Sequence, residues 1–340
     1  MKNQTRSINH EDFFNKQTSG EKIKFMLQYG VLAPSTHNSQ PWLFKIEENS
    51  CKIFVNKEKI IKEADPLGRD LYISFGCLLS NLEISARYFN VFNSIEYSHN
   101  SDYVAKINFK NLSERTEVNE ALKSLIDAIL TRVNTRGIFE KKDLPQEIIS
   151  DIKKENNFED ITIHTIEDKE KIKQLATLTG EGLKMAYKSK LFRKEMFNWM
   201  NNSFSKKKEG IPGYSLRMPS LISLIFPWLV RFLNIGKKVA VLNIMSISSA
   251  PLVTVVTAKD STKETWLNIG RFFEKTTLTL NSKNIKTSIF VASVEMGELY
   301  KKVQEIIESD EIPQFLFIAG YMNFNQKPNL RHSVEVKLIN

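Results

Sequence analysis

Cysteine and histidine are both scarce in this chain. Its 340 residues include two cysteines, Cys51 and Cys77, and five histidines. Two cysteines without a CxxC spacing give no disulfide framework, and the histidines show no metal-ligand spacing. We therefore expect no metal site and a buried, inert thiol at Cys77. A reducing, cytoplasmic compartment is the natural expectation.

Several kinds of segment are also missing. The polar start, residues 1–16, has no apolar region typical of a secretory signal, and no Gly/Ser-rich or Pro-rich linker divides the chain. The net charge of +9 comes from 48 basic and 39 acidic residues, but no zinc, helix-turn-helix or RNA-binding motif accompanies it. We expect no nucleic-acid partner, and a general attraction for small anions.

The most informative feature present is the stretch Ala33 to Trp42, which reads Ala-Pro-Ser-Thr-His-Asn-Ser-Gln-Pro-Trp. Pro34 and Pro41 fix φ and bias the preceding residues to extended geometry. We expect a non-helical loop with free donors and acceptors, formed by Ser35, Thr36, His37, Asn38, Ser39 and Gln40. Such a loop suits recognition of a flat heterocycle, although an ordinary polar turn has the same composition.

A weak internal repeat indicates two similar halves. The segments 73–90 and 268–284 both have apolar residues at helical spacing and one early glycine, Gly76 or Gly270. The two glycines would let the two helices approach closely. Each helix is preceded by an extended run and followed by two more, which predicts an α+β fold with antiparallel or mixed sheets flanked by helices. The best seam between the halves is polar, so we expect halves at 1–115 and 116–340.

The pattern Pro-Ser-x-x-Asn-x-Gln-Pro-Trp resembles the flavin-facing loop of the nitroreductase family. In that family FMN lies between two subunits, and this loop reaches the flavin ring from the subunit opposite the phosphate site. The resemblance implies that Pro34, Ser35 and Asn38 face the ring and that Gln40 braces the loop. His37 neighbours Asn38 and is a candidate donor to the ring or to an acceptor, or simply a solvated imidazole.

A second motif, Arg132 to Phe139, resembles the family's phosphate-binding Arg-x-Ser-x-Arg/Lys. Arg132 and Arg136 would hold the phosphate through forked hydrogen bonds, and Asn134 stands where the family usually has Ser. This motif follows the amide-rich loop instead of preceding it, and the first half shows only Arg6-Ser7 at its start. The order implies one FMN site shared by two halves, as in the fused, pseudo-dimeric Acg-type branch.

Three later residues extend the resemblance. Thr287 and Ser288 resemble the turn that borders the flavin edge, and Arg331 would be a third phosphate contact. The alternatives are that Arg132 and Arg136 are solvated side chains and that Arg331 is a free cation of the tail.

One segment, 192–250, resembles the insertion that forms a lid over the flavin in the Acg-type branch. Within it, 216–235 is apolar but contains Arg217, Pro219, Pro227 and Arg231, which argue against a transmembrane helix. A lid or docking helix is the first interpretation, and contact with a membrane surface is the second.

The resemblance implies an FMN-binding oxidoreductase that reduces nitroaromatic or quinone-type acceptors with NAD(P)H by a ping-pong mechanism. The flavin carries this chemistry, so no catalytic side chain is expected. One alternative is a protein that sequesters or stores FMN and turns over little. Another is a relative without flavin, for which Asn134 and the unmatched first half are the support. We expect a monomer with an internal pseudo-dimer, or a weak homodimer.

Overall fold

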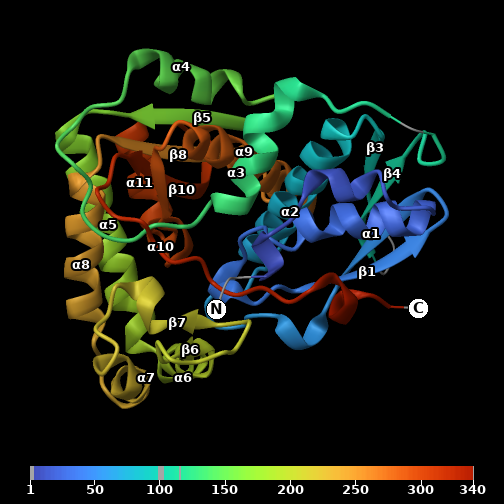
Figure 1. The fold of residues 1–340 in the computed structure, drawn as a ribbon. Coiled ribbons are helices and arrows are strands. Elements are labelled where there is room, and N and C mark those ends of the chain that lie inside the picture. The colour runs from blue at the N-terminus through green and yellow to red at the C-terminus, as the bar shows by residue number, and fades with distance from the viewer. Residues whose placement is uncertain (1–3, 99–102, 115, 340) are drawn as a thin grey trace.

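Two four-stranded antiparallel sheets form the frame of the molecule (Figure 1). The computed structural model describes residues 4–98, 103–114 and 116–339. The first sheet has the order β1-β2-β4-β3, with β1 (Trp42–Glu47), β2 (Ser50–Val55), β3 (Phe92–Tyr97) and β4 (Tyr103–Phe109). The second has the order β5-β8-β10-β9, with β5 (Ile161–Ile166), β8 (Leu252–Ala258), β9 (Lys286–Ile289) and β10 (Ile312–Gly320).

Both halves of the chain have the same topology. Each runs through two strands, a 20-residue helix and two further strands, and each sheet places the fourth strand beside the second. The helices are α2 (Arg69–Tyr88) in the first half and α9 (Lys263–Ser282) in the second. The expected α+β fold with two subunit-like halves is therefore confirmed. The predicted boundary at residue 115 lies outside the described residues.

The two long helices cross at the predicted pair of glycines. A Cβ added to Gly270 would lie 2.0 Å from the carbonyl oxygen of Ile73 and 2.8 Å from the Cα of Gly76. A Cβ added to Gly76 would lie 2.2 Å from the carbonyl oxygen of Leu267. Any side chain here would push two backbones apart, so glycine sets the distance between the halves.

Shorter helices flank the sheets, and one core joins the halves. These helices are α1 (Ser19–Gly30), α3 (Lys123–Thr131), α4 (Gln146–Lys154), α10 (Ala292–Glu295) and α11 (Leu299–Ile307). Thr18 and Glu21 form a capping box that begins α1. The largest apolar cluster contains residues of both halves, such as Leu78 and Ile269, so the halves are not separate domains.

A block of helices separates the first two strands of the second half, where the first half has only a tight hairpin. It contains α5 (Lys169–Lys188), α6 (Lys190–Trp199), β6 (Met200–Asn201), β7 (Ile211–Pro212), α7 (Ile222–Phe232) and α8 (Gly236–Ser249). The predicted insertion, 192–250, begins within α6. None of the helices in the described ranges combines the length and the apolar character that a membrane-spanning helix needs.

The C-terminal tail returns to the first half, as Figure 1 shows. After β10, the chain runs to a 3-10 turn at Val334–Lys337, and the backbone nitrogen of Ile339 donates to the carbonyl oxygen of Phe44 in β1 at 2.9 Å. This path carries Arg331 toward the amide-rich loop.

Candidate functional site

The amide-rich loop, residues 33–42, contains a turn that the sequence did not reveal. The expected non-helical loop is observed, because His37 and Asn38 have left-handed backbone angles, but Thr36–Asn38 also form a tight turn. The reason is local: the backbone nitrogen of Asn38 donates to the carbonyl oxygen of Ser35 at 2.8 Å. His37, Asn38 and Gln40 have φ values of 54°, 58° and 50°. Three left-handed non-glycine residues in one loop require support from the surrounding structure.

That support comes from the insertion and the tail. The Gln40 side chain is fully buried, and its Nε2 donates to the carbonyl oxygen of Lys208 at 2.6 Å. Its Oε1 accepts from the backbone nitrogen of His332 at 2.8 Å, and Lys337 Nζ donates to its carbonyl oxygen at 2.7 Å. The Ser35 hydroxyl accepts from the Gln40 backbone nitrogen at 2.9 Å. Gln40 therefore fastens the loop to two distant segments.

Three arginines gather beside this loop, and we call Arg6, Arg132 and Arg331 the arginine cluster. Arg132 Nε lies 3.1 Å from Glu274 Oε1, and the two side chains are 4% and 0% exposed. Arg331 is buried and donates to Asn38 Oδ1 and, at 3.3 Å, to the carbonyl oxygen of residue 33. The interpretations of Arg132 as a solvated side chain and Arg331 as a free tail cation are therefore wrong.

Arg6 belongs to Arg6-Ser7, the only part of the phosphate-binding motif that the first half shows. The structure places Arg6 in the same cluster. Its Nη1 donates to the carbonyl oxygens of Leu130 at 2.8 Å and Arg132 at 3.1 Å. These acceptors lie at the end of α3, where the helix dipole favours a cation. The two halves thus contribute basic groups to one place.

Positive charge exceeds negative charge within this cluster. Burial, Arg6 and Arg132 hold the pKa of Arg331 well below its ordinary range, and burial and Arg132 lower the pKa of Arg6 to about 9. Burial raises the pKa of Glu274, and Arg132 opposes that shift. The Nε atoms of Arg6 and Arg331 are buried and have no hydrogen-bond partner among the described residues. One carboxylate faces three guanidiniums, an arrangement that favours a bound anion.

The second basic residue of the motif, Arg136, lies beside the Phe290 ring and close enough to His37 to affect it electrostatically. Burial lowers its pKa, and its guanidinium carbon lies 5.5 Å from the centre of the Phe290 ring. Burial lowers the pKa of His37 to about 4, and the Arg136 charge adds to the shift, so the imidazole is neutral at pH 7. The His37 Nε2 is buried without a hydrogen-bond partner among the described residues.

The segment between the two basic residues runs beside strand β9. Asn134 Oδ1 accepts from the backbone nitrogen of Ile289 at 3.3 Å, and the backbone nitrogen of Thr135 donates to the carbonyl oxygen of Thr287 at 2.9 Å. Thr287 and Ser288 are buried, and the Ser288 Oγ has no partner among the residues described. The structure therefore brings Thr287 and Ser288 of β9 next to Asn134. Pro34 lies at the start of the amide-rich loop and is half-buried.

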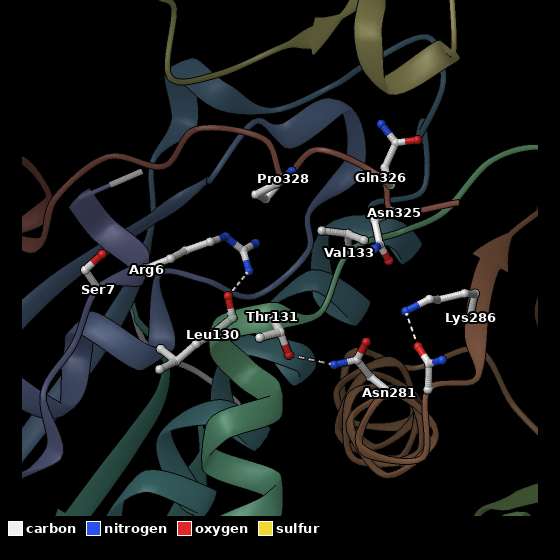
Figure 2. Close-up of a pocket in the computed structure, with 11 residues that line it drawn as sticks. Arg6, Ser7, Leu130, Thr131, Val133, Asn281, Lys286, Asn325, Gln326 and Pro328 are labelled. Atoms are coloured by element: carbon white, nitrogen blue, oxygen red, sulfur yellow. Dashed lines mark hydrogen bonds between the residues drawn. The ribbon is translucent and has the colours of Figure 1, made fainter. Parts of the chain in front are cut away.

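A cavity of about 650 Å³ with a mixed polar and apolar lining opens at Arg6 of the arginine cluster (Figure 2). Arg6 and Lys286 supply the cations of its wall, and the described lining residues include no acidic side chain. Figure 2 shows Arg6 reaching across to the carbonyl oxygen of Leu130. The amide-rich loop does not line this cavity.

Two residues of the site, Glu274 and Lys208, were not predicted from the sequence. Glu274 follows two phenylalanines on an apolar helix face, and a carboxylate at such a position is a signal for a buried ion pair. Lys208 acts through its backbone carbonyl, which no sequence motif reveals.

No family model matches the chain. The Mycobacterium tuberculosis protein named "Putative NAD(P)H nitroreductase acg" is 28% identical over 199 residues, which span 57% of this chain and 58% of that protein. A second M. tuberculosis protein, also named as a putative NAD(P)H nitroreductase, is 32% identical over 65 residues, or 19% of each chain. The match thus covers little more than half of the first relative's length.

Solved structures of low similarity include nitroreductase A from Vibrio parahaemolyticus, 14% identical with a TM-score of 0.37 over 61% of this chain and 71% of that one. Another is an iodotyrosine deiodinase bound to FMN and 3-iodo-L-tyrosine. It is 15% identical, with a TM-score of 0.38, and the match covers 61% of this chain and 95% of that one. These likenesses are too distant to bear on function.

Proposed function

We propose that this chain, which is similar to a putative NAD(P)H nitroreductase over 57% of its length, is an FMN-dependent oxidoreductase that uses NAD(P)H. The observation that carries the proposal is the arginine cluster, in which one buried carboxylate, Glu274, contacts Arg132 and is the acidic group that acts on Arg6 and Arg331. An FMN phosphate carries the charge that such a cluster lacks, and its oxygens match the guanidinium donors.

The proposal assigns the rest of the cofactor to residues of the loop and of strand β9. Arg132, Arg136 and Arg331 would hold the phosphate, with Arg6 as an additional cation. The loop residues Pro34, Ser35, His37, Asn38 and Gln40, together with Asn134, Thr287 and Ser288 of the second half, would surround the ring. Orphaned buried atoms at His37 Nε2 and Ser288 Oγ support a polar ligand at this place.

Bound FMN would supply hydride transfer from NAD(P)H and then electron transfer to a nitroaromatic or quinone-type acceptor. The side chains of the site would bind FMN, orient its ring and shield the ring from solvent. A neutral His37 donates or accepts a hydrogen bond without adding charge beside Arg136. Gln40 and Lys337 would keep the loop in its left-handed conformation, and the insertion contacts the loop through the carbonyl oxygen of Lys208.

A second function, FMN storage, is favoured by one observation. The carbonyl oxygen of Lys208 in the insertion accepts from both Asn38 Nδ2, at 3.0 Å, and Gln40 Nε2. A lid held this closely would slow entry of an acceptor, and a protein of this kind would retain flavin and turn over little.

The test is the visible spectrum of the protein after reconstitution with FMN and desalting, before and after anaerobic NADPH or NADH. Bleaching that an acceptor reverses supports the oxidoreductase. Retained flavin that resists both donors supports storage, and no retained flavin overturns both proposals.

Two variants examine the phosphate assignment. Arg132→Ala and Arg136→Ala should each weaken FMN binding by about 1.5–3 kcal/mol, the range of a charged hydrogen bond, or roughly 10- to 150-fold in Kd. The control is Arg87→Ala, which removes a half-exposed guanidinium paired with Glu83 on α2. Unchanged FMN binding in both site variants would remove the assignment.

A further inference from the structure

Exposed apolar side chains are concentrated on helices α7 and α8 of the insertion. Figure 1 shows these two helices at one corner of the molecule. Nineteen large apolar side chains are exposed among the described residues, and eleven of them lie between Leu221 and Met245. Leu221, Ile225, Trp228 and Phe232 follow one another at helical spacing and are 76%, 58%, 55% and 68% exposed. We call this surface, residues 221–245, the apolar corner.

Charge on the same segment has one sign. Between Gly210 and Lys259 the sequence contains no aspartate or glutamate, while Arg231, Lys237 and Lys238 lie within the apolar corner. The two lysines are exposed at the start of α8, immediately after the apolar stripe of α7 ends. A solvent-exposed helix of a globular protein normally carries both signs of charge on its outer face.

The aromatic side chains are arranged as in an interfacial helix. Trp228 and Phe232 stack with ring centroids 6.0 Å apart, and both are more than half exposed. An indole has an apolar body and a polar N–H, which suits the level of lipid headgroups. Because α7 is an 11-residue helix, it is long enough to lie along a surface and too short to span a bilayer.

We propose that the apolar corner docks onto a membrane surface that contains anionic lipids. The exposed stripe of α7 would enter the interface, and Arg231, Lys237 and Lys238 would meet the acidic headgroups. The uniform positive charge favours this partner over a second copy of the chain, because two identical corners face to face would bring the same cations together. The proposal does not depend on FMN binding.

The experiment is sedimentation of the full chain with lipid vesicles. Vesicles of phosphatidylcholine with about one third phosphatidylglycerol should bind the protein, and added salt should weaken that binding. Vesicles of phosphatidylcholine alone should bind less. Trp228 is the exposed tryptophan, since Trp42 and Trp266 are buried and Trp199 is partly buried, so fluorescence should shift to shorter wavelength on binding. Trp228→Phe should lose most of that shift.

Two matched variants complete the test. Ile225→Glu places an acid in the apolar corner at a side chain that is 58% exposed, and Leu67→Glu makes the same change at one that is 68% exposed elsewhere. We expect Ile225→Glu to weaken vesicle binding about tenfold or more, and Leu67→Glu to leave it unchanged. Absence of binding to anionic vesicles, or equal binding by both variants, would overturn the proposal. So would a wild-type dimer that Ile225→Glu dissociates into monomers without any vesicle binding.

Discussion

Replacing Gly270 by alanine tests the crossing that joins the two halves. The new Cβ would lie 2.0 Å from the carbonyl oxygen of Ile73 and 2.8 Å from the Cα of Gly76, against an ordinary separation of about 3.5 Å or more. Both neighbours are backbone atoms of α2 and cannot rotate away. Helices α2 and α9 must therefore move apart by about 1.5 Å, or the local helix must deform.

The magnitude follows from two opposing terms. Overpacking of a closely packed interior costs about 1–3 kcal/mol, and a contact with backbone belongs at the upper end. Alanine in place of glycine within a helix recovers about 1 kcal/mol. The net loss is about 2 kcal/mol in the free energy of unfolding. With an unfolding entropy of about 2.1 cal/mol/K per residue over 340 residues, Tm should fall by about 3 °C.

The assay is urea and thermal unfolding of Gly270→Ala beside a control, Gly20→Ala. Gly20 lies in the first turn of α1, and a Cβ there would meet only Ile46 Cγ2 at 4.0 Å. This control should be as stable as the wild type, or more stable by up to about 1 kcal/mol. If Gly270→Ala were as stable as Gly20→Ala, the account of the crossing would be refuted.

Two further predictions concern buried carboxylates. Glu274→Gln should destabilise the protein by about 3–5 kcal/mol, because it leaves the arginine cluster without a counter-charge, and inorganic phosphate should then raise its Tm more than that of the wild type. An equal effect of phosphate on both proteins would show that the cluster does not hold an anion. Burial and Asp65 raise the pKa of Asp70 to about 6, so the native carboxyl holds more protons than the unfolded one between about pH 4 and 6, and stability falls as pH rises through that window. Asp70→Asn should make this fall shallower in urea titrations across the range, and an unchanged slope would contradict the assignment.

The repeat of the two halves could be predicted because it depends on the residue pattern of short segments. Apolar residues at helical spacing, one glycine in each helix and extended runs on either side are properties of short segments. Gly76 and Gly270 were also expected to meet, since an unpaired early glycine in an apolar helix indicates a close approach. The non-helical loop was predicted, but its tight turn at Thr36–Asn38 was not, because the turn depends on left-handed φ values that no composition rule assigns to His37 or Asn38.

The features of the candidate site can also be separated into those that the sequence predicts and those that it does not. The sequence by itself determined which segments carry the polar and basic groups: the amide-rich loop, the Arg132–Arg136 motif and Arg331. Only the tertiary structure decided that Arg6 joins Arg132 and Arg331 around Glu274, that Lys208 holds the loop through its carbonyl oxygen, and that the stripe of α7 faces outward. The physical reason is that the number of guanidiniums sharing one carboxylate, and the burial of each, depend on segments that lie far apart in the chain and meet only after folding.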